Sequence, residues 1–201
     1  MAFRASESMN QSSANQDDQR LIQLTLDGQQ EAFGQLIRKY QDRLYNGMVH
    51  ILRDQTEAED VVQDAFILAL TRLSSFKGNS QFFTWLYRIA YNSAITRLRR
   101  RRPTVSLQGS ESSLQLSLPD EGPSPDERMS REEAGNQLMM ALGRLSEEHR
   151  SILILREMDE LDYDAISEIL DLPIGTVRSR LHRARSQLKQ QLEAITGEVE
   201  S

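Results

Sequence analysis

The chain has 201 residues, enough for one ordinary domain or two small ones and too few for a large multidomain enzyme. Its 24 Lys and Arg against 30 Asp and Glu give a net charge of −6, and with 38% hydrophobic residues and no cysteine the composition is that of a soluble, folding protein without disulfides, iron–sulfur clusters or thiol nucleophiles. The longest apolar run covers only 65–70 and the polar N-terminus lacks a signal-peptide core, so we expect a cytoplasmic protein without membrane insertion.

A segment rich in proline and serine, 103–130, divides the chain. It holds four of the five prolines and seven serines and shows no sustained helical or strand period, which is typical of a linker. The linker separates two predicted modules, 18–102 and 131–195, and tails are expected over 1–17, which we predict to be disordered, and over 196–201. At ~3.3 Å per residue the extended linker reaches about 90 Å, so the modules can bind separate points on a partner.

Both modules are predicted to be helical. Apolar residues recur at intervals of three and four without a sustained alternation, which predicts an all-α fold. In the first module we expect a short helix over 21–26, capped by Gly28, and three long helices after it. The long helices are expected over 31–53, from a capping box of Thr56 and Glu59 to residue 73, and from an N-cap at Asn79 or Ser80 to about residue 100.

The second module contains a candidate helix-turn-helix over 163–182. One helix is expected over 131–145, and Ser146 is expected to cap the next. The helix over 163–170 is followed by the turn sequence Asp-Leu-Pro-Ile-Gly and then by Thr176, which we expect to cap a basic helix. A helix, a short turn containing glycine and a basic helix in this order are typical of DNA-binding modules.

The last helix has an outward face that suits a DNA duplex. Residues 172–191 carry five basic side chains and no acid, and a helical wheel with Val177 in the core turns polar and basic side chains outward, toward base edges. Other basic residues and the helix N-terminus suit phosphate contacts, although a solvated cationic face is the plainer alternative. The candidate base contacts are Arg178, Ser179, His182, Arg183 and Ser186, and the candidate phosphate contacts are Thr176, Arg180, Arg185 and Lys189.

The segment 76–85 interleaves aromatic, polar and basic side chains, a mixture that suits unpaired bases. For Phe82 and Trp85 a position in the core is an equally good interpretation. Five arginines in 97–102 suit phosphates or, alternatively, a solvated helix end favoured by the macrodipole. The candidate contacts to single-stranded DNA are Lys77, Asn79, Ser80, Phe82, Trp85, Arg88, Asn92, Arg97, Arg99 and Arg100.

A second polar face is expected on the helix that begins near Thr56. It carries Asp60, Gln63, Asp64 and Ile67, and two carboxylates beside an exposed apolar side chain suit docking on a basic helical partner. The spacing alone fits a solvated face better. Acid–base catalysis by the two carboxylates has little support, because no histidine lies near them in the sequence.

Three segments resemble the extracytoplasmic-function (group IV) sigma factors of bacterial RNA polymerase, in particular the sigma-E type. DVVQDAF at 60–66 is similar to the segment that binds core polymerase, and FTWLYRIAYN at 83–92 to the region that opens and reads the minus-10 element. PIGTVRSRL at 173–181 is similar to the start of the recognition helix for the minus-35 element. The four residues after this second motif, 93–96, lack the Asp that in the family often precedes the arginine at the end of the region.

The resemblance implies a two-domain initiation factor. Residues 18–102 correspond to sigma-70 region 2, which binds the clamp of the polymerase beta-prime subunit through the face of Asp60, Gln63, Asp64 and Ile67 and captures flipped minus-10 bases. Residues 131–195 correspond to region 4, which reads the minus-35 duplex and contacts the flap of the beta subunit. The family has no catalytic residues of its own and often has an anti-sigma partner, so no cofactor and no metal are expected.

Two other classes of function are alternatives to a sigma factor. A stand-alone helix-turn-helix regulator would share the second module, and the core-binding helix would discriminate between the two. An enzyme has no supporting constellation, since His50, His149 and His182 are scattered through the sequence.

Overall fold

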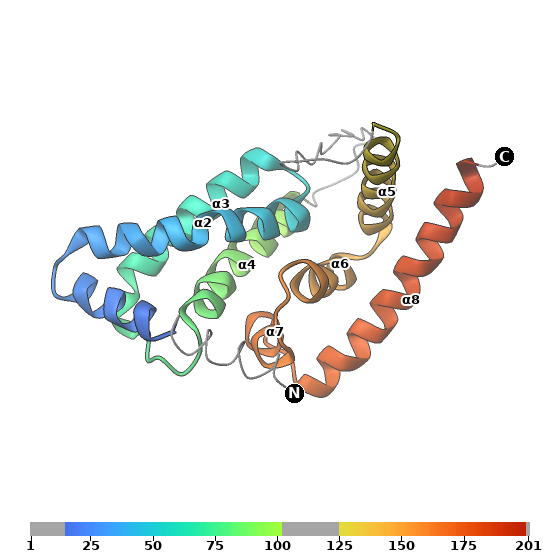
Figure 1. Cartoon of the computed structure of the whole chain (residues 1–201). Coiled ribbons are helices and arrows are strands. Elements are labelled where there is room, and N and C mark those ends of the chain that lie inside the picture. Colours follow the sequence, from blue (N-terminus) through green and yellow to red (C-terminus); the bar gives the residue numbers. More distant parts are fainter. Residues whose placement is uncertain (1–14, 102–124, 200–201) are drawn as a thin grey trace, which may run out of the picture. The chain divides into compact units, whose positions relative to one another are not determined.

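The computed structural model describes residues 15–101 and 125–199, and every regular element in these two stretches is helical (Figure 1). This confirms the all-α prediction. Two compact units divide the chain: the first contains α2, α3 and α4, and the second contains α5, α6 and α8. Residues 1–14 and 102–124, which include most of the expected N-terminal tail and linker, lie outside the described residues. No helix in the described part is long and apolar enough to cross a bilayer.

Three long helices build the first unit after an initial helix over 15–26. They are α2 (Gln30–Leu52), α3 (Gln55–Thr71) and α4 (Phe82–Arg101), with a single 3-10 turn, η1 (Leu73–Ser75), between the last two. Each buries one apolar stripe, and α3 packs against both α2 and α4, as Figure 1 shows. The buried side of α3 is narrow, consisting of Ala58, Val61, Val62, Ala65, Phe66 and Ala69.

The initial helix begins earlier than the predicted residue 21 because it is fastened to α2. Asp18 is only 3% exposed, and its carboxylate accepts hydrogen bonds from the Tyr40 hydroxyl and the Lys39 ammonium group. Burial, followed by the bond to Asp18, raises the pKa of Tyr40 far above its ordinary value, so the phenol stays protonated as a donor. Residues 15–17, expected in a disordered tail, are therefore helical. Gly28, with φ of +95°, ends this helix as predicted.

The second unit is built around one long helix. Its elements are α5 (Pro125–Arg144), α6 (Glu147–Leu153), a π-helical turn η2 (Ile154–Met158) and α8 (Ile174–Val199), and α7 (Tyr163–Leu170) precedes α8 in the sequence. Both α5 and α6 pack against α8. The predicted cap at Ser146 is confirmed, since its hydroxyl accepts a hydrogen bond from the His149 backbone N–H.

Several other predicted helix boundaries are wrong. The N-cap of α3 is Asp54, which follows the left-handed Arg53 and accepts from the Glu57 N–H at 3.0 Å, so the predicted cap Thr56 lies inside the first turn. The helix α4 begins at Phe82, after the predicted caps. The helix α5 begins at Pro125 rather than 131, because proline is favoured at the first helical position. The helix α8 continues to Val199, past the expected end at 195.

Stability of the first unit is predicted to fall in mild acid because of His50. This side chain is 8% exposed, burial lowers its pKa, and its Nδ1 finds no hydrogen-bond partner in the described part of the chain. The unfolded chain takes up a proton near pH 6.5 while the folded unit does not, so the free energy of unfolding decreases as the pH falls below about 6.5.

Urea unfolding followed by Trp85, the only tryptophan, measures this effect in the first unit. The midpoint of the wild type should fall between pH 7 and pH 5, and His50→Gln should flatten that dependence. Identical pH dependence in the two proteins would contradict the assignment to His50.

Candidate functional site

The exposed side of α3 carries the four residues predicted to dock on a partner. Asp60, Gln63, Asp64 and Ile67 are all exposed, and Ile67 is 55% exposed although it is a large apolar residue. Leu70, one turn further along, is 48% exposed and extends the apolar part of this face. Leu70 is absent from the predicted face, although residues three positions apart, such as Ile67 and Leu70, lie on the same side of a helix. These five residues are called the α3 face below.

A cation of the chain itself occupies the α3 face. The Arg97 guanidinium on α4 donates from Nη1 to Asp60 Oδ2 at 3.2 Å and from Nη2 to Asp64 Oδ2 at 2.7 Å. Burial works to lower the pKa of Arg97, but the hydrogen bonds to the two carboxylates outweigh it and raise that pKa above its usual value. In this conformation the Arg97 guanidinium is bonded to the two acids, and the contact between Arg97 and DNA stays a prediction.

The aromatic residues before and within α4 form a cluster. The Phe76 ring lies 5.2 Å from Trp85 and 5.9 Å from Phe82, between centroids. Phe82 is fully buried, so it belongs to the core, and the predicted contact between its ring and a base is wrong. Trp85 is only partly buried.

The predicted polar contacts around this cluster lie at the surface to different degrees. Lys77 and Asn79 are exposed on a loop that turns at Gly78, which has a φ of +70°. Ser80 and Arg88 are partly buried. The remaining candidates, Asn92, Arg99 and Arg100, are exposed along α4.

A short turn leads from α7 into α8. Asp162 Oδ1 caps α7 by accepting from the Ala165 N–H at 2.7 Å. The turn ends with Pro173, whose carbonyl accepts from the N–H groups of both Thr176 and Val177. The helix α8 therefore begins at Ile174, and the prediction that Thr176 caps it is wrong.

The helix α8 orients its side chains as the helical wheel predicts. Val177, Leu181 and Ala184 are buried, while the opposite side of the helix is exposed. This exposed side is called the α8 face and consists of Arg178, Ser179, His182, Arg183 and Ser186. Arg178 lies over the Tyr163 ring, with 5.8 Å from its Cζ to the centroid, and Arg156 lies over the same ring at 5.2 Å.

Two cations predicted to hold phosphates have acidic partners within the unit. Arg180 pairs with Glu148 at 3.2 Å and Arg185 with Glu157 at 2.6 Å. Glu148, Glu157 and Tyr163 are absent from the predicted site, because the arginines of α8 that they contact lie at least 15 positions away and no periodicity reports such contacts. Thr176 is partly buried in the first turn of α8, and Lys189 is exposed and lies 3.7 Å from Glu193.

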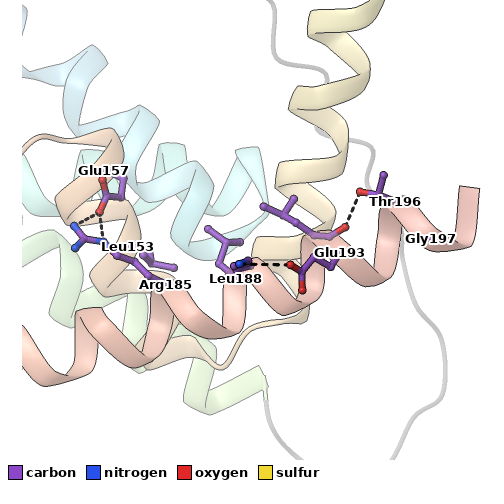
Figure 2. A pocket seen from close by; sticks show the side chains of 9 residues that line it. Leu153, Glu157, Arg185, Leu188, Glu193, Thr196 and Gly197 are labelled. Atoms are coloured by element: carbon purple, nitrogen blue, oxygen red, sulfur yellow. Dashed lines mark hydrogen bonds and ion pairs between the residues drawn. The ribbon is translucent and has the colours of Figure 1, made fainter.

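A shallow apolar groove runs along the C-terminal half of α8 (Figure 2). Leu153, Leu188 and Leu192 line it, and the ion pair of Glu157 and Arg185 closes one end. Among the described residues, no group of three or more His, Asp or Glu side chains is arranged to hold a metal ion.

Comparison with known proteins identifies both units. Residues 36–104 match the family described as Sigma-70 region 2, and residues 135–188 match Sigma-70, region 4. The chain is 36% identical to the ECF RNA polymerase sigma factor SigW of Bacillus subtilis, over 84% of this chain and 92% of that protein. It is 37% identical to the RNA polymerase sigma-H factor of Pseudomonas aeruginosa, over 92% of this chain and 98% of that protein.

Two solved structures have a similar fold. CnrH, in complex with the cytosolic domain of CnrY, superposes with a TM-score of 0.65 at 26% identity and covers 89% of this chain and 98% of that one. The sigma factor RpoE of Bartonella quintana, in complex with the anti-sigma factor NepR, gives 0.60 at 24% identity over 80% of this chain and 96% of that one. Together with the two sigma-70 regions and the curated relatives, this likeness places the chain in the family of extracytoplasmic-function RNA polymerase sigma factors.

Proposed function

We propose that three surfaces divide the work of promoter-specific initiation in this sigma factor. The α3 face docks on the clamp of the core polymerase, the loop and α4 from Lys77 to Arg100 hold the melted minus-10 strand, and the α8 face reads the minus-35 duplex. The observation that carries the proposal is the α8 face, where five polar or basic side chains point outward from one buried stripe. A recognition helix needs this arrangement to enter the major groove.

Within the α8 face, Arg183 is the best candidate for reading a base. Its side chain is exposed, and arginine binds guanine O6 and N7 through two parallel hydrogen bonds. Arg180 and Arg185 are held by Glu148 and Glu157, which keeps their guanidinium groups near the helix flanks. That position suits phosphates on either side of the groove, as long as the exposed carboxylates release them or share them.

On α4, Trp85 is a partly exposed aromatic residue close to the loop before the helix. With Phe82 in the core, stacking on a flipped base falls to Trp85, while Lys77, Asn79, Ser80, Arg88 and Asn92 supply polar contacts around it. Arg99 and Arg100 extend the basic surface toward the end of α4, where they suit the phosphate backbone.

The relatives also suggest partners beyond the clamp. CnrH is seen with the cytosolic domain of CnrY and RpoE with the anti-sigma factor NepR, and an anti-sigma factor is the corresponding partner for this chain. Contact between the second unit and the beta-subunit flap is part of the same proposal. The chain acts in the cytoplasm, where polymerase and chromosome meet, and it has no reaction of its own because the polymerase performs the chemistry. A stand-alone regulator accounts for the second unit only and leaves the sigma-70 region 2 match unexplained.

Asp64→Lys should abolish docking on the polymerase. The substitution replaces an attractive charge on the α3 face with a repulsive one, which should weaken binding to core polymerase at least about tenfold. Asp42→Lys, an equal charge change at an exposed position of α2, is the matched control and should bind normally. Equal affinities of both variants and wild type, measured by titration of labelled chain with core, would contradict this docking face.

Arg183→Ala and Arg100→Ala should weaken promoter binding in different ways. Loss of Arg183 should cost roughly 1–3 kcal/mol at one base pair of the minus-35 element and relax specificity there. Loss of Arg100 should weaken binding evenly across sequences and reduce the slope of log K against log salt by about one. Holoenzyme binding to a panel of single-base promoter variants at several salt concentrations measures both, and the same pattern for the two variants would refute these roles.

Tyr163 should support promoter binding by holding Arg178 in place. An exposed cation–π contact is worth about 0.5–1 kcal/mol, so Tyr163→Ala should lower affinity for the minus-35 duplex about twofold to fivefold. Tyr163→Phe keeps the ring and should bind like the wild type. If the alanine and phenylalanine variants bind equally well, Tyr163 has no such role.

A further inference from the structure

We propose that Arg97 is an intramolecular competitor for the polymerase. It holds Asp60 and Asp64 in the free chain and is released toward promoter DNA when the polymerase takes these carboxylates. The inference rests on the proposed function of the α3 face and adds a regulatory device to it. Polymerase docking and DNA contact are thereby coupled, because both depend on the movement of the Arg97 side chain.

The geometry places one guanidinium across both acids. Asp60 and Asp64 lie four positions apart, one turn of α3, so their carboxylates are neighbours on the helix surface. Arg97 uses Nη1 for the first at 3.2 Å and Nη2 for the second at 2.7 Å. A planar guanidinium with several fixed donors can bridge two acids in this way, which a lysine ammonium does less well. The α3 face is therefore partly neutralised before any partner arrives.

A basic group on the polymerase must compete for the same oxygens. The side chains of Asp60 and Asp64 are 57% and 52% exposed, so a partner reaches them from solvent, whereas Arg97 is 29% exposed and approaches from α4. Ion pairs this exposed contribute little net stability, because water competes for both ions. The contact is accordingly weak enough to be displaced by a partner that excludes water. In the free chain it lowers the affinity of the α3 face for core polymerase.

Once released, the Arg97 side chain lies beside other basic side chains of α4. Arg100 is three positions after Arg97, so the two lie on neighbouring positions of the α4 surface, and Arg100 is exposed. Once the carboxylates are engaged by the polymerase, Arg97 joins Arg99 and Arg100 and adds a cation to the proposed phosphate-binding surface. Neutralising one further phosphate changes the salt dependence of DNA binding by about one unit of slope.

The test compares Arg97→Gln with Arg99→Gln in the full chain. Arg99 is an exposed arginine of the same helix, so the two substitutions remove equal charge from α4. Arg97→Gln should bind core polymerase about twofold to fivefold more tightly than wild type, whereas Arg99→Gln should leave core affinity unchanged. With promoter DNA, holoenzyme containing either variant should lose about one unit of salt slope.

Other results overturn the proposal. Core affinity of Arg97→Gln equal to wild type would mean that the carboxylates are not contested, and weaker binding would mean that Arg97 positions them for the polymerase. Arg97→Lys, which keeps the charge and loses the planar fork, should lie between wild type and Arg97→Gln and provides a second test if the glutamine variant unfolds. Urea unfolding followed by Trp85 fluorescence checks that point.

Failure of this inference is distinguishable from failure of the proposed function. If Asp64→Lys retains core binding, the α3 face is not the docking site and Arg97 cannot compete with the polymerase for it. If Asp64→Lys loses core binding while Arg97→Gln binds core like the wild type, the docking site stands and only the competition is refuted.

Discussion

The first unit depends on the fact that α3 has only two usable faces. Small and β-branched residues on one side are buried between α2 and α4, which lets the three helices approach closely. The opposite side of α3 is exposed and carries two acids and exposed apolar residues, and the proposed function places docking on this side. Packing of the core also brings Arg97 on α4 within reach of Asp60 and Asp64.

The same constraint orders the second unit. Val177, Leu181 and Ala184 fix one side of α8 in the core, and the side chains on the other side point outward as a consequence. Acids on α6 and η2 then hold Arg180 and Arg185 at the edges of that face. A sigma factor that reads two promoter elements needs two surfaces of this kind, and each unit of this chain supplies its own.

Local patterns in the sequence predicted the helices and their buried stripes well, because periodicity reports which side of a helix faces the core. Helix starts were predicted less well. Asp54 and Thr56 both lie where a cap of α3 is plausible, and backbone geometry, with the left-handed Arg53 before Asp54, selects between them. Pairs distant in sequence were out of reach. Arg97 bonds acids 33 and 37 positions away, and whether Phe82 or Trp85 is buried depends on packing against Phe76 and α2.

In the proposed function the two units read two separate promoter elements for one polymerase. Transcription reconstituted from this chain and sigma-free core polymerase on a genomic fragment library, with transcript starts sequenced, tests it most directly. We expect starts that share two upstream motifs at a constant spacing. Starts that share a single motif, or a chain that binds core polymerase and yields no specific starts on any fragment, would contradict it.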